Sequence, residues 1–136
     1  MQTYTYVSKG KFELMEKPKP VLMHERDAIV KVTLASICSS DLHIKHGSVP
    51  RAVPGITVGH EMVGVVEEVG SAVTNLTFKT GGVDGCDCKE TLRLIEEGKI
   101  DTEPLITHTY PLSKIAEAYD LFENKKDGVI KVAVEC

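Results

Sequence analysis

The chain has 136 residues, of which 42% are hydrophobic and 26% charged, and its formal net charge is −4 at pH 7. This composition is typical of one globular domain with a single core, so we expect residues 1–136 to form one domain. The acidic balance, without a basic stripe, argues against nucleic acid and against an anionic membrane surface as partners.

The sequence also indicates a cytoplasmic protein. No apolar run is long enough to span a bilayer, and the N-terminus, MQTYTYVSKGKF, has neither the charged start nor the apolar centre of a secretion signal. The cysteines, at positions 38, 86, 88 and 136, are too few for a disulfide scaffold. In a reducing compartment we therefore expect thiol or metal roles for them.

The first part of the chain is predicted to be β-structure. Residues 2–8 and 11–17 alternate roughly between apolar and polar around Gly10, which predicts a hairpin, and the KPKP that follows ends it. From 27 to 38, apolar residues at every second position share one face of a strand, and the same parity continues to Cys38. We therefore expect Cys38 to leave this strand pointing in the same direction as the core residues.

A short helix and a second β-region are predicted next. SSDLHIKHG suits one or two helical turns, with serines as N-caps and Gly47 as the stop. Residues 56–69 are rich in Val and return to a β pattern, but glycines at positions 55, 59, 64 and 70 interrupt them. We therefore expect bulges or bends typical of a small barrel.

Beyond TGGVDG the apolar period changes from 2 to 3.6, which predicts a helix. Asp87 and Glu90 have the spacing of a capping box, and Gly98 lies where a glycine commonly ends a helix. The apolar stripe of this helix consists of Cys88, Leu92 and Ile95.

The C-terminal part is predicted to run through a strand, a helix and a last strand. PLITHTYP at 104–111 indicates a short strand, and Ser113 begins a helix. The apolar side chains of this helix recur at Ile115, Tyr119 and Phe122. A turn at Asp127-Gly128 then leads to the strand VIKVAVE.

Cys38 and His60 together suggest a metal site. Taken alone, Cys38 is more often a small buried hydrophobe, and His60 in a Val-rich strand has an ordinary interpretation as a hydrogen-bonded core imidazole. Thiolate and imidazole, however, are both donors that zinc prefers. Catalytic zinc takes three protein ligands and keeps the fourth position open.

Three polar residues accompany this pair. Asp41 lies one helical turn after Cys38, so its carboxylate either orients a ligand or caps the helix. Ser40 and His43 have a similar spacing, and a hydroxyl beside an imidazole can pass a proton. The alternative for His43 is an exposed histidine at a helix end, and for His46 we prefer that interpretation.

The segments CSSDLH, GHE and GVVEEVG resemble the zinc-dependent medium-chain alcohol dehydrogenases, specifically their GroES-like catalytic domain. The resemblance implies an α+β fold that is mainly β, a GroES-like β-barrel with a few short helices. It also implies that Cys38 and His60 bind the catalytic zinc, and that Glu61 approaches the metal from behind.

The same resemblance implies roles for the neighbouring residues. Ser40 and His43 match the positions that relay a proton from the substrate alcohol, and Asp41 matches the position that supports the metal shell. The tail from LIEEGK onward resembles the family's C-terminus, which folds back onto the catalytic domain.

Members of this family are more than twice as long, because a nucleotide-binding domain and a structural zinc lobe lie between these two parts. No G-x-G-x-x-G occurs in this chain, so no Rossmann domain and no dinucleotide site of that type are expected. NLTFKTGG resembles a piece from near the far end of that domain. We therefore expect a join near Asn75-Leu76 that divides an N-terminal barrel part, 1–75, from a C-terminal return segment, 76–136.

The family's third zinc ligand comes from the missing stretch. Glu61 could replace it, but neighbouring residues on a regular strand point to opposite faces, so a bulge would be required. Cys86 and Cys88 lack the C-x-x-C spacing of structural zinc. We give them no metal role and expect them to take part in packing at the start of their helix.

These observations predict a truncated, zinc-binding catalytic domain of an alcohol dehydrogenase-like oxidoreductase, formed by a natural or engineered deletion. Zn²⁺ binding is expected to be weaker than in full-length relatives, and NAD(P), the parent family's cofactor, is not expected to bind. The parent's substrate is a small-molecule alcohol or carbonyl compound, and whether this chain is itself an enzyme stays open.

Two alternatives remain. One is a non-catalytic, oligomeric GroES-like binding or assembly module, and the other is an open zinc site with low hydrolytic activity. A homo-oligomer is expected both for the truncated catalytic domain and for the assembly module, because loss of a domain exposes the apolar surface that it covered.

Overall fold

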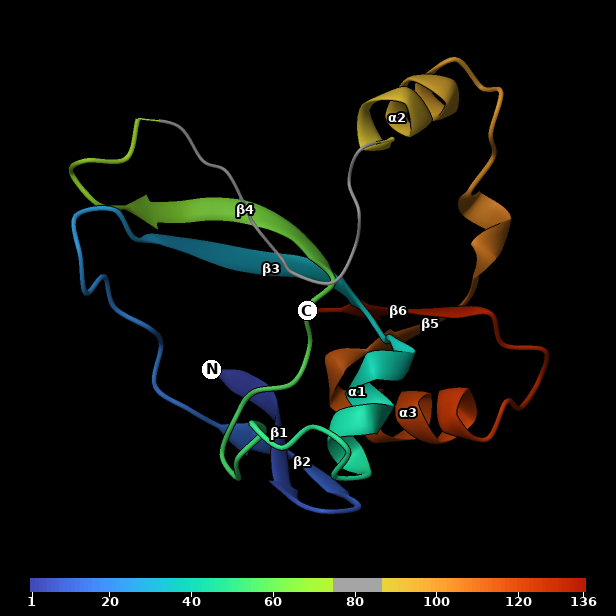
Figure 1. Cartoon of the computed structure of the whole chain (residues 1–136), viewed down its shortest axis with the longest axis horizontal. Helices are drawn as coiled ribbons and strands as arrows, with labels where there is room; N and C mark the ends of the chain where they lie inside the picture. Colours follow the sequence, from blue (N-terminus) through green and yellow to red (C-terminus); the bar gives the residue numbers. More distant parts are fainter. Residues whose placement is uncertain (75–86) are drawn as a thin grey trace.

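The computed structural model describes residues 1–74 and 87–136, and Figure 1 shows the arrangement of their elements. The described strands are β1 (Gln2–Ser8), β2 (Lys11–Glu16), β3 (Ala28–Ser36), β4 (Met62–Val69), β5 (Ile106–Pro111) and β6 (Lys131–Glu135). The described helices are α1 (Ser39–Lys45), α2 (Cys88–Glu96) and α3 (Ile115–Glu123), with short 3₁₀ helices η1 (Glu103–Leu105) and η2 (Leu112–Lys114). The α+β class predicted from the sequence is confirmed. The expected join near Asn75-Leu76, and Cys86, lie outside the described residues.

β1 and β2 form the predicted antiparallel hairpin, with Tyr4 opposite Leu14. Gly10 occupies its turn with a φ of 83°, a left-handed conformation that glycine adopts without steric cost. The other side of β1 accepts the segment that precedes β4, because the Tyr6 amide donates to the Ile56 carbonyl at 3.0 Å. The segment that contains Ile56 therefore pairs with the hairpin first and then leads into β4 of the second sheet.

The second sheet has the strand order β4-β3-β6-β5. β3 runs antiparallel to both β4 and β6, whereas β5 and β6 are parallel. The predicted C-terminal strands are thus confirmed, and β6 lies beside β3. This pairing brings the C-terminal segment against the strand that leads to Cys38.

The core joins the N-terminal hairpin to the C-terminal segment. The ring centroid of Tyr4 lies 5.1 Å from that of Tyr119 on α3, and Phe12 packs edge-on against Tyr119 at 5.6 Å. The remaining buried apolar residues of this cluster are Tyr6, Ile37, Ile115, Ala118, Val132 and Val134. The predicted apolar face of α3 is therefore confirmed by the burial of Ile115 and Tyr119, and this face packs against one side of the hairpin.

Regular strand structure begins later than the β pattern at 56–69 predicts. β4 begins at Met62, because the residues before it pair with β1 and Gly59 then turns the chain with a φ of 120°. The expected irregularities are confirmed as shifts in the β3–β4 register. One lies near Gly64, where an added Cβ would be 2.3 Å from the Lys31 carbonyl oxygen.

Helix α2 differs from its prediction at the N-terminus. The capping box is wrong, because in the described chain Asp87 makes no side-chain cap bond and Glu90 instead pairs with Arg93 at 2.6 Å. The apolar stripe does not pack as expected, since Cys88 is exposed and Leu92 is 60% exposed. Figure 1 shows the reason, as α2 lies away from the other described elements. Gly98 does end the helix region, with a φ of 68°.

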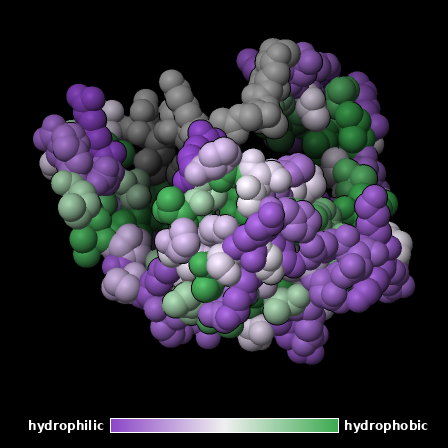
Figure 2. All heavy atoms as spheres, turned by 60° about the horizontal axis from the view of Figure 1, so that its bottom comes forward, coloured by the Kyte–Doolittle hydropathy of each residue, from purple (hydrophilic) through white to green (hydrophobic). Residues whose placement is uncertain are grey.

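Strand β4 presents unusually apolar, accessible side chains. Val63 and Val65 are 60% and 63% exposed, although β4 pairs with β3 along its length. In Figure 2 much of the face toward the viewer is hydrophilic, and the apolar surface gathers toward its two sides. No helix in the described ranges is long and apolar enough to cross a membrane.

Candidate metal centre

Cys38 lies at the junction between β3 and α1. Two backbone bonds hold this junction: the Ile37 amide donates to the Val132 carbonyl, and the Ser36 amide donates to the Glu61 carbonyl, both at 3.1 Å. Cys38 itself is the N-cap residue of α1 and is partly buried. The prediction that a serine caps this helix is therefore wrong, because the extended backbone of Cys38 precedes the first helical residue.

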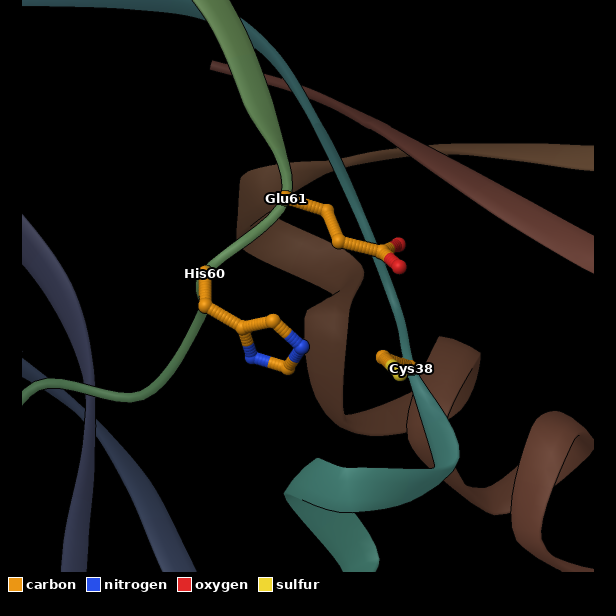
Figure 3. Close-up of side chains that lie close together, drawn as sticks. All are labelled: Cys38, His60 and Glu61. Carbon is orange, nitrogen blue, oxygen red and sulfur yellow. The ribbon is translucent and has the colours of Figure 1, made fainter. Parts of the chain in front are cut away.

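His60 and Glu61 approach Cys38 from the segment immediately before β4 (Figure 3). Neither residue lies in a regular strand, so the alternation of side chains that argued against a joint role does not apply to them. The positive φ of Gly59 makes the bend that precedes the pair. One donor atom from each of Cys38, His60 and Glu61 lies within 4.8 Å of the others.

Asp41 connects both sides of this cluster. Its side chain is fully buried, and Oδ2 accepts a hydrogen bond from the Cys38 amide at 3.1 Å. Oδ1 lies 3.3 Å from His60 Nδ1 and has no hydrogen-bond partner of good geometry in the described chain. The carboxylate therefore caps α1, as one interpretation of the sequence has it, and also faces the candidate ligand His60.

Ser40 lies between the two candidate ligands. Its Oγ is 3.2 Å from Cys38 Sγ and 3.0 Å from His60 Nε2. In the tautomer with the proton on Nδ1, Nε2 is the acceptor nitrogen, so the Ser40 hydroxyl can donate to only one of its two neighbours at a time. His43 is exposed on α1 and, within the described residues, makes no hydrogen bond with Ser40. The relay role of Ser40 and His43 stays a prediction.

Glu61 has a partner that the sequence did not reveal. Lys131 on β6 forms an ion pair with Glu61 Oε2. Partial burial opposes ionisation, but hydrogen bonding and charge from Lys131 outweigh it and hold the pKa of Glu61 below its ordinary value. The carboxylate is therefore ionised at neutral pH.

An open groove of about 520 Å³ lies beside the cluster. His60 and Glu61 line one part of it, and apolar residues of β3 and β4, including Val30 and Val63, line the rest. His60 and Glu61 thus have one side that small molecules or ions can reach.

The residues present fit a zinc ion. Sulfur, imidazole nitrogen and carboxylate oxygen form a donor set typical of zinc, and zinc bonds of about 2.0–2.3 Å separate neighbouring ligands by roughly 3–4 Å. Donor atoms within 4.8 Å of one another need only a small closure to reach such spacings. The buried Asp41 Oδ1 beside His60 Nδ1 matches the carboxylate that commonly orients a zinc-bound histidine.

Comparison with known proteins points in the same direction. The family model described as "Alcohol dehydrogenase GroES-like domain" matches residues 24–103. An alcohol dehydrogenase of Cupriavidus necator is 46% identical over 88 residues, which cover 65% of this chain and 24% of that protein. An uncharacterized zinc-type alcohol dehydrogenase-like protein of Bacillus subtilis is 42% identical over 76 residues, or 56% of this chain and 20% of the relative.

Solved structures show the same similarity. The apo form of zinc dependent alcohol dehydrogenase 2 from Streptococcus pneumonia superimposes with a TM-score of 0.54 at 43% identity, covering 56% of this chain and 22% of that one. An alcohol dehydrogenase of Thermus sp. ATN1 gives a TM-score of 0.52 at the same identity. This chain spans about a quarter of the length of the Cupriavidus necator relative and about a fifth of that of the Bacillus subtilis relative.

Proposed function

The chain belongs to the alcohol dehydrogenase GroES-like domain family, and on that premise we propose that it is the zinc-binding part of an alcohol dehydrogenase-like oxidoreductase. In this proposal Cys38, His60 and Glu61 hold Zn²⁺, Asp41 orients His60, and the chain corresponds to the catalytic domain without its nucleotide-binding domain. The observation that carries the proposal is the convergence of the three donor atoms within 4.8 Å from two separate segments.

When bound, zinc supplies a Lewis acid that polarises an alcohol or carbonyl oxygen. The chain's own residues supply orientation and proton handling. Asp41 Oδ1, at 3.3 Å from His60 Nδ1, favours the tautomer with the proton on Nδ1, which leaves Nε2 available as the ligand atom. The Ser40 hydroxyl, at 3.0 Å from His60 Nε2, holds a proton beside the site, and the exposed His43 is the group proposed to pass it to solvent.

We further propose that this chain alone does not oxidise alcohols with NAD(P). Hydride transfer requires a nicotinamide held beside the substrate, and the sequence contains no G-x-G-x-x-G to bind one. Action on small-molecule alcohols or carbonyl compounds is accordingly proposed for the longer parent protein. Alcohol-dependent reduction of NAD⁺ or NADP⁺ by the purified chain would contradict this statement.

The zinc proposal is tested by measuring metal content by mass spectrometry in chain purified without added zinc. We expect zinc in the unmodified chain and its loss in Cys38→Ser and in His60→Ala. Cys136→Ser is the matched control, because Cys136 is also a free thiol but lies at the exposed end of β6. A folded chain without zinc, or equal zinc in all four proteins, would refute the site.

A related proposal concerns the cellular compartment in which the protein acts. Cys38, Cys88 and Cys136, the cysteines in the described ranges, are free thiols. Free thiols and a thiolate ligand are typical of reducing compartments, which supports the cytoplasm as the site of action.

A second candidate function, an oligomeric assembly module, is favoured by the exposed valines of β4. Apolar side chains that a partner does not cover tend to associate. Under this candidate the metal residues have no role, so a metal-free chain that folds and assembles normally would support it over the zinc site.

A further inference from the structure

Tyr119 links the C-terminal helix α3 to the candidate metal centre. Its ring is buried in the aromatic cluster of the core, with 4% of its surface exposed. Its hydroxyl donates a hydrogen bond of 3.1 Å to Oδ2 of Asp41, which lies 78 positions earlier in the chain. The hydroxyl of this core tyrosine is thus hydrogen-bonded to Asp41, the carboxylate that faces His60.

The two oxygens of Asp41 are held in different ways. Oδ2 accepts from both the Cys38 amide and the Tyr119 hydroxyl. Two donors from different directions keep the carboxylate from rotating, and this fixes Oδ1 at 3.3 Å from His60 Nδ1. Rotation of the Asp41 carboxylate would move both of its oxygens, Oδ1, which faces His60, and Oδ2, which accepts from the Cys38 amide.

The donor itself is rigid. α3 is anchored by the buried side chains of Ile115 and Ala118, and the Tyr119 ring packs between Tyr4 and Phe12. Burial, together with the charge of Asp41, raises the pKa of Tyr119 far above its ordinary value, so the hydroxyl remains a donor. The buried ring therefore presents the hydroxyl oxygen from a fixed position.

We propose that Tyr119 is a positioning residue of the metal centre, which acts through Asp41 to hold Cys38 and His60 in the arrangement that a metal ion requires. The inference rests on the proposed zinc site, and it adds a residue from the opposite end of the chain to that site. Tyr119 is not one of the three candidate ligands, so removal of its hydroxyl leaves the ligand set unchanged and tests only how those ligands are positioned.

The test uses Co²⁺ as a spectroscopic substitute for zinc. Tyr119→Phe removes only the hydroxyl and keeps the ring in the core. We expect Co²⁺ to bind about tenfold more weakly, the low end of the loss that follows removal of a partner outside the ligand set. We also expect altered absorption bands of the bound cobalt, because these bands report ligand geometry and a purely structural role would leave them unchanged.

Tyr4→Phe is the matched control. Tyr4 lies in the same cluster, 5.1 Å from Tyr119, and in the described structure it makes no hydrogen bond with Asp41 or a candidate ligand. It should bind Co²⁺ with unchanged affinity and spectrum. Circular dichroism must show both variants fully folded at the temperature of the titration. Equal affinity and spectrum in Tyr119→Phe and the unmodified chain would overturn the inference.

Two further measurements show whether a negative result refutes the role of Tyr119 or the zinc site itself. If Tyr119 acts through Asp41, then Tyr119→Phe has no further effect on cobalt affinity in an Asp41→Asn background, and additive losses would overturn that route. A chain that binds no cobalt even without mutation refutes the zinc site itself, whereas loss of binding in Cys38→Ser with normal binding in Tyr119→Phe refutes only the role of Tyr119.

A measurement on the unmodified chain covers the case in which Tyr119→Phe does not fold. Zinc is titrated while the tyrosine ring resonances are followed by NMR. We expect the Tyr119 resonances to shift and those of Tyr4 to remain in place, because only Tyr119 is bonded to the carboxylate at the centre. An unchanged Tyr119 signal on saturation with zinc would overturn the proposal.

Discussion

Lys131 on β6 forms an ion pair with Glu61, which lies directly before β4. The same carboxylate is one of the three candidate metal ligands. In the proposed zinc site a lysine and the metal cation would compete for one anionic group, and the positive charge of the lysine would also disfavour a second cation nearby. Because β6 lies beside β3, we expect the C-terminal strand to influence how strongly the proposed site binds metal.

We predict that Lys131→Met binds zinc about three- to tenfold more tightly than the unmodified chain, since an interaction of roughly 1 kcal/mol is typical for a partly exposed pair. Methionine keeps much of the side-chain length without the charge. Affinity is measured by competition with a fluorescent zinc chelator. Lys126→Met, which removes the exposed pair with Asp120 on the far end of α3, should leave affinity unchanged. Weaker binding in Lys131→Met would show that the lysine supports the site.

The bend at Gly59 gives a second prediction. Gly59→Ala places a side chain at a φ of 120°, which costs about 1–3 kcal/mol of stability, and relaxation of this strain should move His60 and Glu61. We expect a lower free energy of unfolding in urea and weaker zinc binding. Gly10→Ala, with a φ of 83° in the hairpin turn, should lower stability but preserve zinc affinity. Equal zinc affinity in both variants would contradict the role of this bend.

The contact between α1 and α3 predicts a dependence on pH. Hydrogen bonds from Lys45 and then His46 hold the pKa of Glu123 below its ordinary value of 4.5. A lowered folded-state pKa contributes stability above pH 4.5, and this contribution is lost as the pH falls through the folded-state value. Glu123→Gln should therefore unfold more easily by about 1 kcal/mol at neutral pH.

This difference should shrink in acid, below the ordinary pKa, and urea unfolding across a pH series measures it. Glu117→Gln is the control on the same helix, because Glu117 is exposed and lies 4.0 Å from Lys114. A stability difference for Glu123→Gln that persists unchanged into strong acid would show that its charge is not the cause.

The exposed valines of β4 predict self-association. We expect the average mass of the unmodified chain to rise with concentration in sedimentation experiments, and Val65→Lys to reduce that rise by placing a charge on the strand. Val21→Lys is the control, because Val21 is 70% exposed but lies outside the strands. Identical masses for Val65→Lys and the unmodified chain at all concentrations would exclude β4 as the contact.

Local sequence patterns were sufficient for most of the elements. Period-2 alternation and Gly10 predicted the hairpin, and the 3.6-residue recurrence of Ile115, Tyr119 and Phe122 predicted α3, of which Ile115 and Tyr119 are buried. Such patterns succeed because backbone conformation and the facing of side chains depend on residues close together in the chain. The same patterns correctly placed the start of α2, whose N-cap residue is Asp87, but wrongly predicted its capping-box bonds and the packing of its apolar stripe, because packing depends on a partner that no local pattern identifies.

The chemistry of Cys38, His60 and Glu61, and the spacing of Asp41 from Cys38, could be recognised from the sequence by itself. Only the tertiary structure decided that His60 and Glu61 can face the same space, because their segment bends at Gly59 before the strand begins. It alone also placed Tyr119 and Lys131 at the centre, since each lies at least 70 positions from its partner. The strand order and the packing of α3 determine those contacts, and neither is encoded in any short stretch of the chain.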